Sequence, residues 1–401
     1  MVSYFFIMLL IINSSQIFLN NYQDEMLAFS TVVAMLGLYY YRRIPSLFFL
    51  FFVSLLLLWV GYIVIQYDVW NMTTAIGFLC RIFLAYSVVA ILCDRFFPTL
   101  LDVVYKLAII SLPLYFIGLL FPFIMEQFHS MLNLMPDLFI IERGEYIGWL
   151  RANFMVYTFS VVRLGQNHGF MWEPTAFAGV LLFAIMIHLC MNNCQLDRKF
   201  KVLLITLLTT FSTTGFLAFS LVVAFILING HANYKVIVGL AAIILLPYIF
   251  SLDFISDKVG LEIEQWDDIS SINTSLTMSG NTRLSSFIYD MRDFDDHPLL
   301  GSGIFIENRY TGAQTQLSVN GVGNTLSRFG LILSIIFMIN MALSFKRLSL
   351  DNHTRGHFLF VLLYITISWS ETLTILPLFI AFQLYYMVYI VGFRSARTLA
   401  N

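Results

Sequence analysis

Charged residues are scarce in this chain: only 11% of its 401 residues are Asp, Glu, Lys or Arg, whereas 59% are hydrophobic. A soluble protein could not bury so much apolar surface. The net charge is only −2, and no basic patch stands out, so the composition gives no support for a nucleic-acid partner. The scarcity of charge therefore indicates a membrane protein.

Cysteine is also rare, and the four cysteines lie in or beside apolar segments: Cys80, Cys93, Cys190 and Cys194. None lies in the two long polar stretches of the sequence, which argues against a disulfide framework. The N-terminal stretch MVSYFFIMLLIINSS has neither a basic beginning nor a small-residue cleavage site. We therefore expect it to form a retained first helix and not a cleaved signal peptide.

Long hydrophobic runs are what the sequence has in abundance. A helix needs roughly 17–25 apolar residues to cross a ~30 Å hydrocarbon core. The apolar segments lie at about 2–19, 26–41, 46–65, 75–93, 103–125, 171–191, 201–214, 216–229, 236–250, 324–344, 357–375 and 377–393. We predict an all-α polytopic protein in which 1–401 form one membrane domain with about twelve transmembrane helices, interrupted by long polar loops at 126–170 and 251–323.

The distribution of Lys and Arg predicts the orientation of these helices. If the N-terminus is cytoplasmic, the inner connections and the C-terminal tail hold half of the 22 basic residues: Arg42, Arg43, Arg95, Arg198, Lys199, Lys235, Lys346, Arg347, Arg355, Arg394 and Arg397. The short outer connections at 20–25 and 66–74 hold none, as the positive-inside rule requires. Both long loops would then face the periplasm, with both termini in the cytoplasm of a bacterium.

The segment 201–229 could form either one long helix or two short ones. Two helices keep the later basic residues on the inner side, so we prefer them, with a turn at 212–215. Each would be about 21 Å long, too short to cross the membrane fully. The turn would then lie below the outer surface, where backbone is tolerated only against protein or a water-filled cavity.

The stretch GFMWEPTAFA places a carboxylate at the threshold of an apolar helix. Pro174 marks the helix start, so Glu173 lies at or near the N-cap, where the helix dipole stabilises a carboxylate by about 0.3–1 kcal/mol. Phe170, Met171 and Trp172 fit a belt at the membrane interface. Two interpretations of Glu173 stay open: a helix cap, or a carboxylate at the mouth of a cavity.

Three other ionisable residues, Arg81, Arg328 and Glu371, fall inside apolar segments near their outer ends. Ionisable groups within a membrane are costly and usually face the bundle interior or a cavity. They could form structural ion pairs, Arg81 with Glu173 or Arg328 with Glu371. They could equally form a site, and the same groups can do both.

The second long loop contains NTRLSSFIYDMRDFDDHPLLGSG. Arg283, Arg292 and His297 could hold anions, while Gly301 and Gly303 allow the backbone to approach a ligand closely. The aspartates of this stretch are more typical of a solvated or arginine-paired cluster than of a metal site: Asp293, Asp295 and Asp296.

These motifs, in this order, resemble a known family. GFMWEPTAFA resembles the Gly-Phe-x-Trp-Glu-Pro-x-x-Phe signature of bacterial O-antigen and capsular polysaccharide polymerases, the Wzy family. STTG looks like that family's Ser-x-x-Gly turn, and TRLSSFIYDMRDFDDHPLLGSG is similar to its Arg…His-Pro-Leu-x-Gly-x-Gly pattern. NTLSRFGLI resembles the Leu-x-x-x-Gly stretch that follows, so that the matches cover about 163–332.

The resemblance implies a metal-independent, cofactor-free membrane glycosyltransferase of the O-antigen polymerase and ligase group. Its substrates would be undecaprenyl-diphosphate-linked glycans, as donor and as acceptor, and a polysaccharide chain-length regulator is a further expected partner. The resemblance carries Glu173, Arg283, His297 and Arg328 over as site candidates.

The chain departs from the family in two places. The family has an arginine three residues before Gly169, where this chain has Gln166; Arg163, three residues further back, is the candidate substitute. The ligase branch has His-Asn where this chain has Val319-Asn320. The missing histidine favours a polymerase over a ligase.

The chemistry of glycan transfer suggests a role for each candidate. An acceptor hydroxyl attacks the anomeric carbon of the donor, and this direct attack inverts the configuration of that carbon. The enzyme therefore needs cations that stabilise the departing diphosphate and a base that accepts the hydroxyl proton. Arginine forks suit a diphosphate, so we expect Arg81, Arg283 and Arg328 there, with Arg292 as a further candidate. Glu173 is the first candidate base, followed by His297 and Glu371. A flippase for lipid-linked oligosaccharide and an O-antigen ligase remain the alternative functions.

Overall fold

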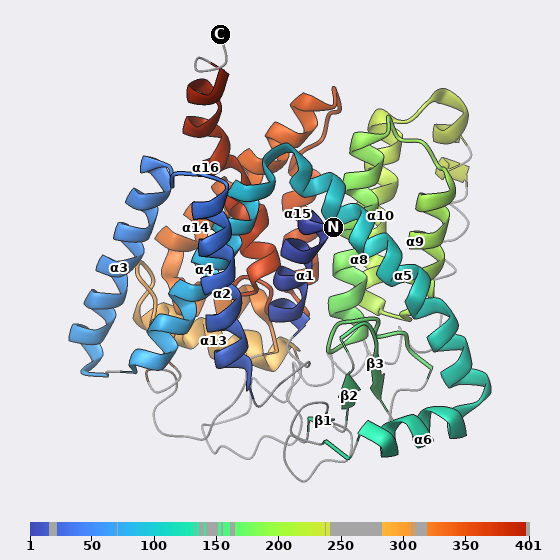
Figure 1. Cartoon of the computed structure of the whole chain (residues 1–401), viewed down its shortest axis with the longest axis horizontal. Coiled ribbons are helices and arrows are strands. Elements are labelled where there is room, and N and C mark those ends of the chain that lie inside the picture. The colour runs from blue at the N-terminus through green and yellow to red at the C-terminus, as the bar shows by residue number, and fades with distance from the viewer. Residues whose placement is uncertain are drawn as a thin grey trace.

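The structure is a computed structural model. It describes residues 1–15, 22–69, 71–132, 134–135, 140–141, 151–153, 155–160, 165–236, 238–240, 283–305, 308 and 319–397. Helices dominate this part of the chain, and short strands occur only at one end of the bundle (Figure 1). The described residues are therefore all-α in class, as the sequence predicted.

The first half of the chain begins with helices that match the predicted apolar segments. They are α1 (Val2–Ser15), α2 (Gln23–Tyr40), α3 (Leu47–Tyr67), α4 (Met72–Leu92) and α5 (Phe96–Leu120). After α6 (Pro122–Leu132) come three short antiparallel strands, β1 (Ile140–Ile141), β2 (Arg151–Asn153) and β3 (Thr158–Ser160), paired in the order β1-β2-β3. Helix α6 and the strands lie within or at the edge of the predicted first polar loop.

The second half begins with the segments that carry the motifs. Its elements are α8 (Pro174–Met191), α9 (Arg198–Thr209), α10 (Thr213–Asn229), α13 (Arg283–Asp296), α14 (Gly321–Asp351), α15 (Phe358–Ser368) and α16 (Pro377–Arg397). Two helices, α9 and α10, occupy 201–229, so the prediction of two short helices is confirmed. Most of the predicted segment 236–250 lies outside the described residues.

Four stretches of the described chain are long and apolar enough to cross a membrane: Leu47–Tyr67, Met72–Leu120, Pro174–Met191 and Gly321–Asp351. Shorter apolar helices accompany them, namely Val2–Ser15, Thr213–Asn229, Phe358–Ser368 and Pro377–Val388. The helices therefore have the character of a polytopic membrane protein.

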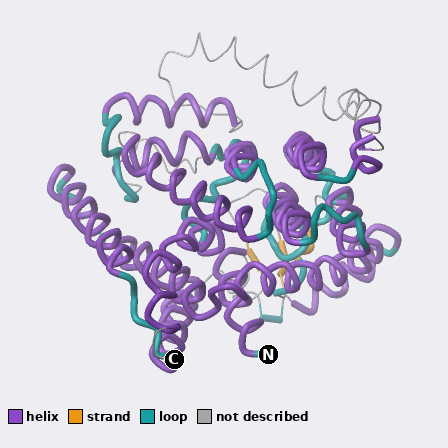
Figure 2. Tube along the Cα trace, turned by 90° about the horizontal axis from the view of Figure 1, so that it is seen from above, coloured by secondary structure: helices purple, strands orange, loops and turns teal. Residues whose placement is uncertain are grey.

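The connections between helices separate into two groups. Figure 1 shows the α2–α3, α4–α5, α8–α9 and α14–α15 connections at the upper end, and the α3–α4 connection, the strands and α13 at the lower end. Helix α1 begins part-way between the two ends, and in the view from above it begins at the same edge at which α16 ends (Figure 2). Most of the predicted inner connections thus share the upper end, and the described parts of both polar loops share the lower one.

Helix α8 lies at the centre of the bundle. All its residues from Pro174 to Cys190 are buried, and it packs against α5, α9, α10 and α15. A helix that is apolar on every side is suited to such a position. Phe183 shows the packing well, because its ring lies within 5.2–5.8 Å, centroid to centroid, of the rings of Phe345, Phe379 and Phe382. The residue that precedes α8 is therefore attached to a helix that is buried along almost its whole length.

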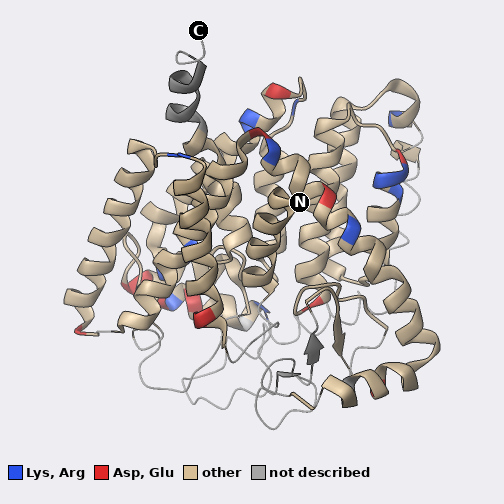
Figure 3. Ribbon diagram, viewed as in Figure 1, with Lys and Arg blue, Asp and Glu red and all other residues tan. Residues whose placement is uncertain are grey.

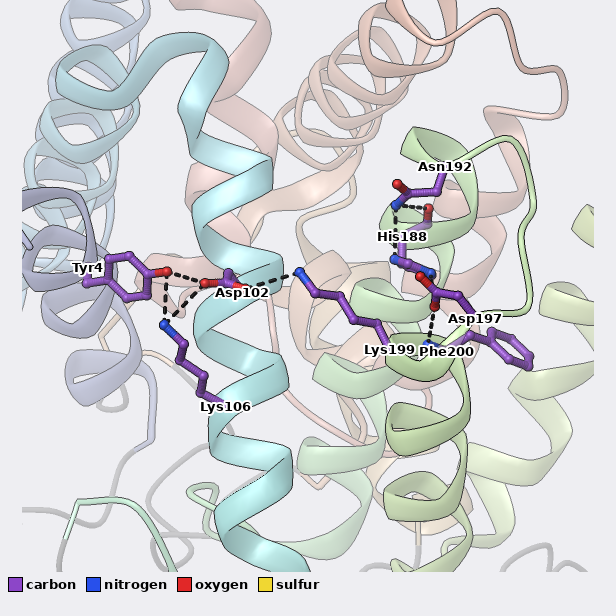
Figure 4. A network of polar contacts seen from close by, with 8 residues as sticks. All are labelled: Tyr4, Asp102, Lys106, His188, Asn192, Asp197, Lys199 and Phe200. Carbon is purple, nitrogen blue, oxygen red and sulfur yellow. Dashed lines mark hydrogen bonds and ion pairs between the residues drawn. The ribbon is translucent and has the colours of Figure 1, made fainter.

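A polar network joins α1, α5, α8 and α9 further towards the upper end (Figure 4). Asp102 of α5 accepts a hydrogen bond from the Tyr4 hydroxyl, and its carboxylate lies 3.3 Å from Lys106 Nζ and 3.1 Å from Lys199 Nζ. Beside it, Asp197 caps α9 and lies 2.9 Å from Nε2 of the buried His188. The network fixes these helices to one another, away from the motif segments.

Candidate functional site

Glu173 lies at the start of the central helix, as the sequence predicted. Its φ of −138° and ψ of 153° are those of extended backbone, and Pro174 begins α8. The Glu173 side chain is half-buried and makes no capping hydrogen bond. Glu173 therefore occupies the N-cap position of α8, as the sequence predicted, although its side chain does not supply the capping hydrogen bond.

The aromatic run before Glu173 does not form the predicted belt at the membrane interface. Phe170 and Met171 are completely buried, and the ring of Phe170 packs edge-on against Phe177 of α8 at 5.4 Å. Trp172 is partly buried and also packs against the core. The sequence could not show this, because buried and interfacial positions accept the same apolar residues. The run anchors the backbone that carries Glu173.

Asn167 is a positioning residue that the sequence analysis missed. It is completely buried, and its amide nitrogen donates to Oγ1 of Thr209 (3.0 Å) and to Oγ of Ser111 (3.3 Å). Its side-chain oxygen accepts a hydrogen bond from the backbone N–H of Gly169 at 2.9 Å. Asn167 thus ties the approach to Glu173 to both α5 and α9. The only sequence signal was an amide next to a buried aromatic run.

A buried tyrosine secures the strand that leads into this segment. Tyr157 packs in a small cluster with Tyr115 of α5, Met125 of α6 and Phe159 of β3. Burial raises the pKa of Tyr157, so its hydroxyl stays neutral. The backbone N–H of Thr158 then donates to the carbonyl of Gly169. The first polar loop is therefore fastened to the bundle close to Glu173.

The STTG turn lies directly beside the start of α8. Ser212 caps α10 by accepting from the N–H of Gly215 (3.1 Å), and its hydroxyl donates to Thr175 Oγ1 (3.1 Å). On the other side, Thr214 and Ser370 share a hydrogen bond of 2.6 Å. The turn therefore packs against protein, and it joins the Glu173 segment to the Glu371 segment.

Glu371 lies in the connection between α15 and α16. The sequence predicted one helix over 357–375, but α15 ends at Ser368, so that prediction is wrong for its last turns. Glu371 is only 5% exposed, and its carbonyl faces α14 so closely that a Cβ at Gly321 would lie 2.0 Å from the carbonyl oxygen. Only glycine fits at that point of α14, because the carbonyl occupies the space of a side chain.

Further hydrogen bonds continue from Glu371 along α14. Asn324 Nδ2 donates to Thr372 Oγ1 (3.2 Å), and Thr325 and Thr374 share a hydrogen bond of 2.5 Å. We call these four hydrogen-bonded pairs the polar belt: Ser212 with Thr175, Thr214 with Ser370, Asn324 with Thr372, and Thr325 with Thr374. Its contacts connect the beginning of α8, the STTG turn, the Glu371 segment and the beginning of α14.

Helix α14 is broken at Gly330, whose φ of 64° and ψ of −176° are accessible almost only to glycine. In an intact helix, the N–H groups of residues 331 and 332 would bond to the carbonyls four residues earlier. Here these two N–H groups, and the carbonyls of Ser327 and Arg328, bond instead to residues of the second polar loop. The bonds are Leu331 N to Pro298 O (2.8 Å), Ile332 N to Leu299 O (3.2 Å), Ser302 N to Ser327 O (2.7 Å) and Gly303 N to Arg328 O (2.9 Å).

We call residues 298–303 the loop clamp, because they satisfy the backbone groups that the break in α14 leaves open. Unsatisfied backbone groups within a membrane cost several kcal/mol each, so the clamp is what makes the break tolerable. Trp59 Nε1 holds the clamp in turn by donating to the Leu300 carbonyl at 2.8 Å. The Pro-Leu-Leu-Gly-Ser-Gly part of the motif is thus structural, and it fixes the backbone at Arg328.

Replacing Gly301 by alanine is expected to destabilise the protein. Gly301 has a φ of 71°, and an added Cβ would lie 2.4 Å from the Arg328 carbonyl oxygen. Backbone strain of this kind costs about 1–3 kcal/mol before the clash is counted. The midpoint of thermal unfolding in detergent should fall for Gly301→Ala but not for Gly61→Ala, because a Cβ at Gly61 meets nothing within 4 Å. Equal midpoints would contradict the clamp.

Arg81 and Arg328 line the same cavity, although they come from opposite halves of the sequence. The cavity measures about 150 Å³. Its lining is Asp24, Thr73, Thr74, Gly77, Phe78, Arg81, Ile304, Arg328 and Ile375. Arg81 and Arg328 are half-buried, whereas Asp24 and Thr73 are exposed at the mouth. Figure 3 shows acidic and basic residues together around the lower ends of α2, α4 and α13.

Asp24 is the residue of this cavity that the sequence analysis did not anticipate. It lies in the first turn of α2, where an acidic side chain also suits the helix dipole. Acidic residues are common in the first turn of a helix, so nothing in the sequence indicates that Asp24 also lies beside Arg81. Arg81 therefore has the carboxylate of Asp24 as a neighbour. Neither ion pair suggested by the sequence, Arg81 with Glu173 or Arg328 with Glu371, included Asp24.

The other candidate residues lie on or near α13, outside the cavity lining. Arg283 begins α13, and Arg292 is exposed, with its guanidinium 5.3 Å above the Tyr289 ring. The ring of His297 packs edge-on against Tyr67 at 5.2 Å. Helix α13 packs against α14, so these residues border the site without lining the cavity. Arg163 lies outside the described residues.

The described part of the chain contains no group of three or more His, Cys, Asp or Glu side chains that could hold a metal ion. No protein-family model matches this chain, and no curated protein matches it. The evidence for function is therefore the chemistry of the motifs and the contacts that gather them. Those contacts bring guanidinium groups, carboxylates and hydroxyls to one end of an apolar helical bundle.

Proposed function

We propose that this chain is a membrane glycosyltransferase that polymerises undecaprenyl-diphosphate-linked oligosaccharide repeat units at the periplasmic face of the bacterial inner membrane. The observation that carries the proposal is the shared cavity of Arg81 and Arg328, at the end of the bundle where the polar belt joins the Glu173 and Glu371 segments to α14. A lipid-linked diphosphate lies at the membrane surface while its lipid stays in the bilayer. Cations at the ends of apolar helices match that position.

In the proposed reaction, a hydroxyl of the acceptor glycan attacks the anomeric carbon of the donor. The new glycosidic bond forms as the bond from that carbon to the diphosphate breaks, and the carbon is inverted. Arg328, with Arg81 or Arg283, stabilises the departing diphosphate through charged hydrogen bonds. Glu173 accepts the hydroxyl proton, with His297 and Glu371 as rival bases. Diphosphate is a good leaving group, so no acid is needed to protonate it.

The direct test uses the purified protein in proteoliposomes with the lipid-linked repeat unit of its own host. We expect a ladder of elongated glycans that remain attached to undecaprenyl diphosphate. Movement of unelongated repeat units across the bilayer would favour the flippase instead. Transfer of glycan to an added lipid A core would favour the ligase. In cells, loss of the protein should leave lipid that carries a single repeat unit.

Filling the cavity is expected to reduce polymerisation. Gly77 lines the cavity, and a Cβ added there meets nothing within 4 Å, so a larger side chain can be accommodated without a clash at its base. Gly77→Leu should therefore leave the protein folded but lower the rate of elongation by roughly tenfold or more, since a leucine side chain occupies much of a small polar pocket. Gly61→Leu on α3 is the matched control. Equal rates for both variants would exclude the cavity from the reaction.

A further inference from the structure

The cavity of Arg81 and Arg328 differs from a simple phosphate site in one respect. It contains a carboxylate, Asp24, as well as the two guanidinium groups. A diphosphate would be repelled by that carboxylate, since like charges close together are unfavourable. The side chain of Asp24 therefore disfavours phosphate in its part of the cavity, and that part must suit a different chemical group.

The remaining lining has the composition that binds a sugar ring. Thr73 and Thr74 each offer a hydroxyl that can both donate and accept a hydrogen bond. A carboxylate accepts from pairs of sugar hydroxyls, and a guanidinium donates to sugar oxygens. Phe78, Ile304 and Ile375 supply an apolar surface for the C–H face of a ring. The lining is thus complementary to a neutral polar ligand that also has an apolar face.

The walls of the cavity are held in place. The ring of Phe78 lies 5.7 Å from the ring of Phe329 and 6.3 Å from that of Trp59. Trp59 and Phe329 belong to the same region as the loop clamp, because Trp59 donates to the Leu300 carbonyl and Phe329 follows Arg328. A rigid wall of this kind gives selectivity at little cost in entropy on binding.

The size of the cavity limits the ligand further. Pockets for drug-sized molecules measure roughly 300–1,000 Å³, whereas this cavity measures about 150 Å³. A single sugar ring therefore suits the part of the cavity that the described residues line. Arg328 lines the same cavity, so a diphosphate bound by Arg328 would lie next to the sugar ring in it. The sugar in that position is the one directly attached to the diphosphate.

We propose that this cavity is a subsite for the first sugar of the lipid-linked glycan, the sugar joined to the diphosphate, and that Asp24 determines its selectivity. The inference rests on the proposed function and adds to it a substrate determinant. Arg81 then acts mainly with Asp24 on the sugar, and Arg328 acts on the diphosphate. This division of roles replaces the expectation that both arginines bind phosphate.

The test compares two probes on the purified full-length protein. One is the undecaprenyl-diphosphate-linked repeat unit extracted from cells that lack this protein, and the other is undecaprenyl diphosphate without sugar. Asp24→Asn should weaken binding of the first probe roughly tenfold, the typical effect of losing hydrogen bonds to a charged group. It should leave binding of undecaprenyl diphosphate unchanged or tighter. Glu25 is the exposed neighbour of Asp24 on α2, and Glu25→Gln should leave the binding of both probes unchanged.

The outcomes separate this inference from the proposed function. If Asp24→Asn tightens binding of both probes equally, the cavity binds phosphate alone and the sugar subsite is wrong. If the variant leaves the binding of both probes unchanged, or weakens the binding of both equally, Asp24 does not select the sugar and the inference also fails. In that case, elongation by the wild-type protein would still support the proposed function. Wild-type protein that binds neither probe and elongates nothing would overturn both.

Discussion

Replacing Arg328 with alanine is expected to lower glycan elongation by about 10²–10³-fold, the usual loss when one stabiliser of a developing charge is removed. Arg328 is half-buried and faces the cavity at the point where α14 breaks. Its contribution to the loop clamp comes from its backbone carbonyl, which accepts from Gly303 N at 2.9 Å. The substitution removes the side chain but keeps that hydrogen bond, so the loop clamp should persist.

Two further variants show whether the guanidinium itself matters. Arg328→Lys keeps the charge but replaces a planar fork by a point charge, so we expect its activity to fall between those of the wild type and Arg328→Ala. Arg347 lies on the same helix, where its Nε is 3.0 Å from Asp351 Oδ2 on the exposed surface. Arg347→Ala should elongate normally. Full activity of Arg328→Ala, measured as glycan ladder per unit time, would remove Arg328 from the site.

Glu173→Gln is expected to abolish long glycan chains in cells and to lower elongation in vitro by about 10²–10⁴-fold, the range that general bases contribute. Glutamine has nearly the same shape as glutamate but cannot accept the proton. Because the Glu173 side chain makes no capping hydrogen bond, its replacement should not shorten α8. The measurement is the elongation rate at equal amounts of folded protein.

Other carboxylates and the histidine provide the comparison for Glu173. Glu126 is exposed on α6, so Glu126→Gln should be fully active and serves as the control. If Glu173→Gln elongates normally while Glu371→Gln or His297→Ala does not, the base is the rival residue. If all three variants retain normal rates, the proposed proton transfer has no support among these residues.

Much of the helical framework follows from the sequence, because length and apolar composition are local properties. The two short helices of 201–229 were predictable from the STTG stretch and from the distribution of basic residues. The start of α8 was predictable from Pro174, since proline suits the first position of a helix. The ends of helices were less predictable: the last turns predicted after Ser368 became the connection that carries Glu371.

The site was only partly predictable, because its assembly depends on contacts between distant segments. The break in α14 could not be read from RFGLI, since a single glycine in an apolar run usually continues the helix. It depends on the partner residues 298–303, which supply the missing hydrogen bonds. Asp24 was missed for a similar reason: nothing next to it in the sequence shows that Arg81 lies beside it in the cavity.

The loop clamp also bears on the order in which the chain is assembled. Residues 298–303 leave the ribosome before α14, so the partner of the break is already made when the helix emerges. The hydrogen bonds at the break can form only once residues 298–303 lie beside the beginning of α14. A chain in which those residues lie elsewhere would leave backbone groups of α14 without hydrogen-bond partners, which is costly wherever water is excluded.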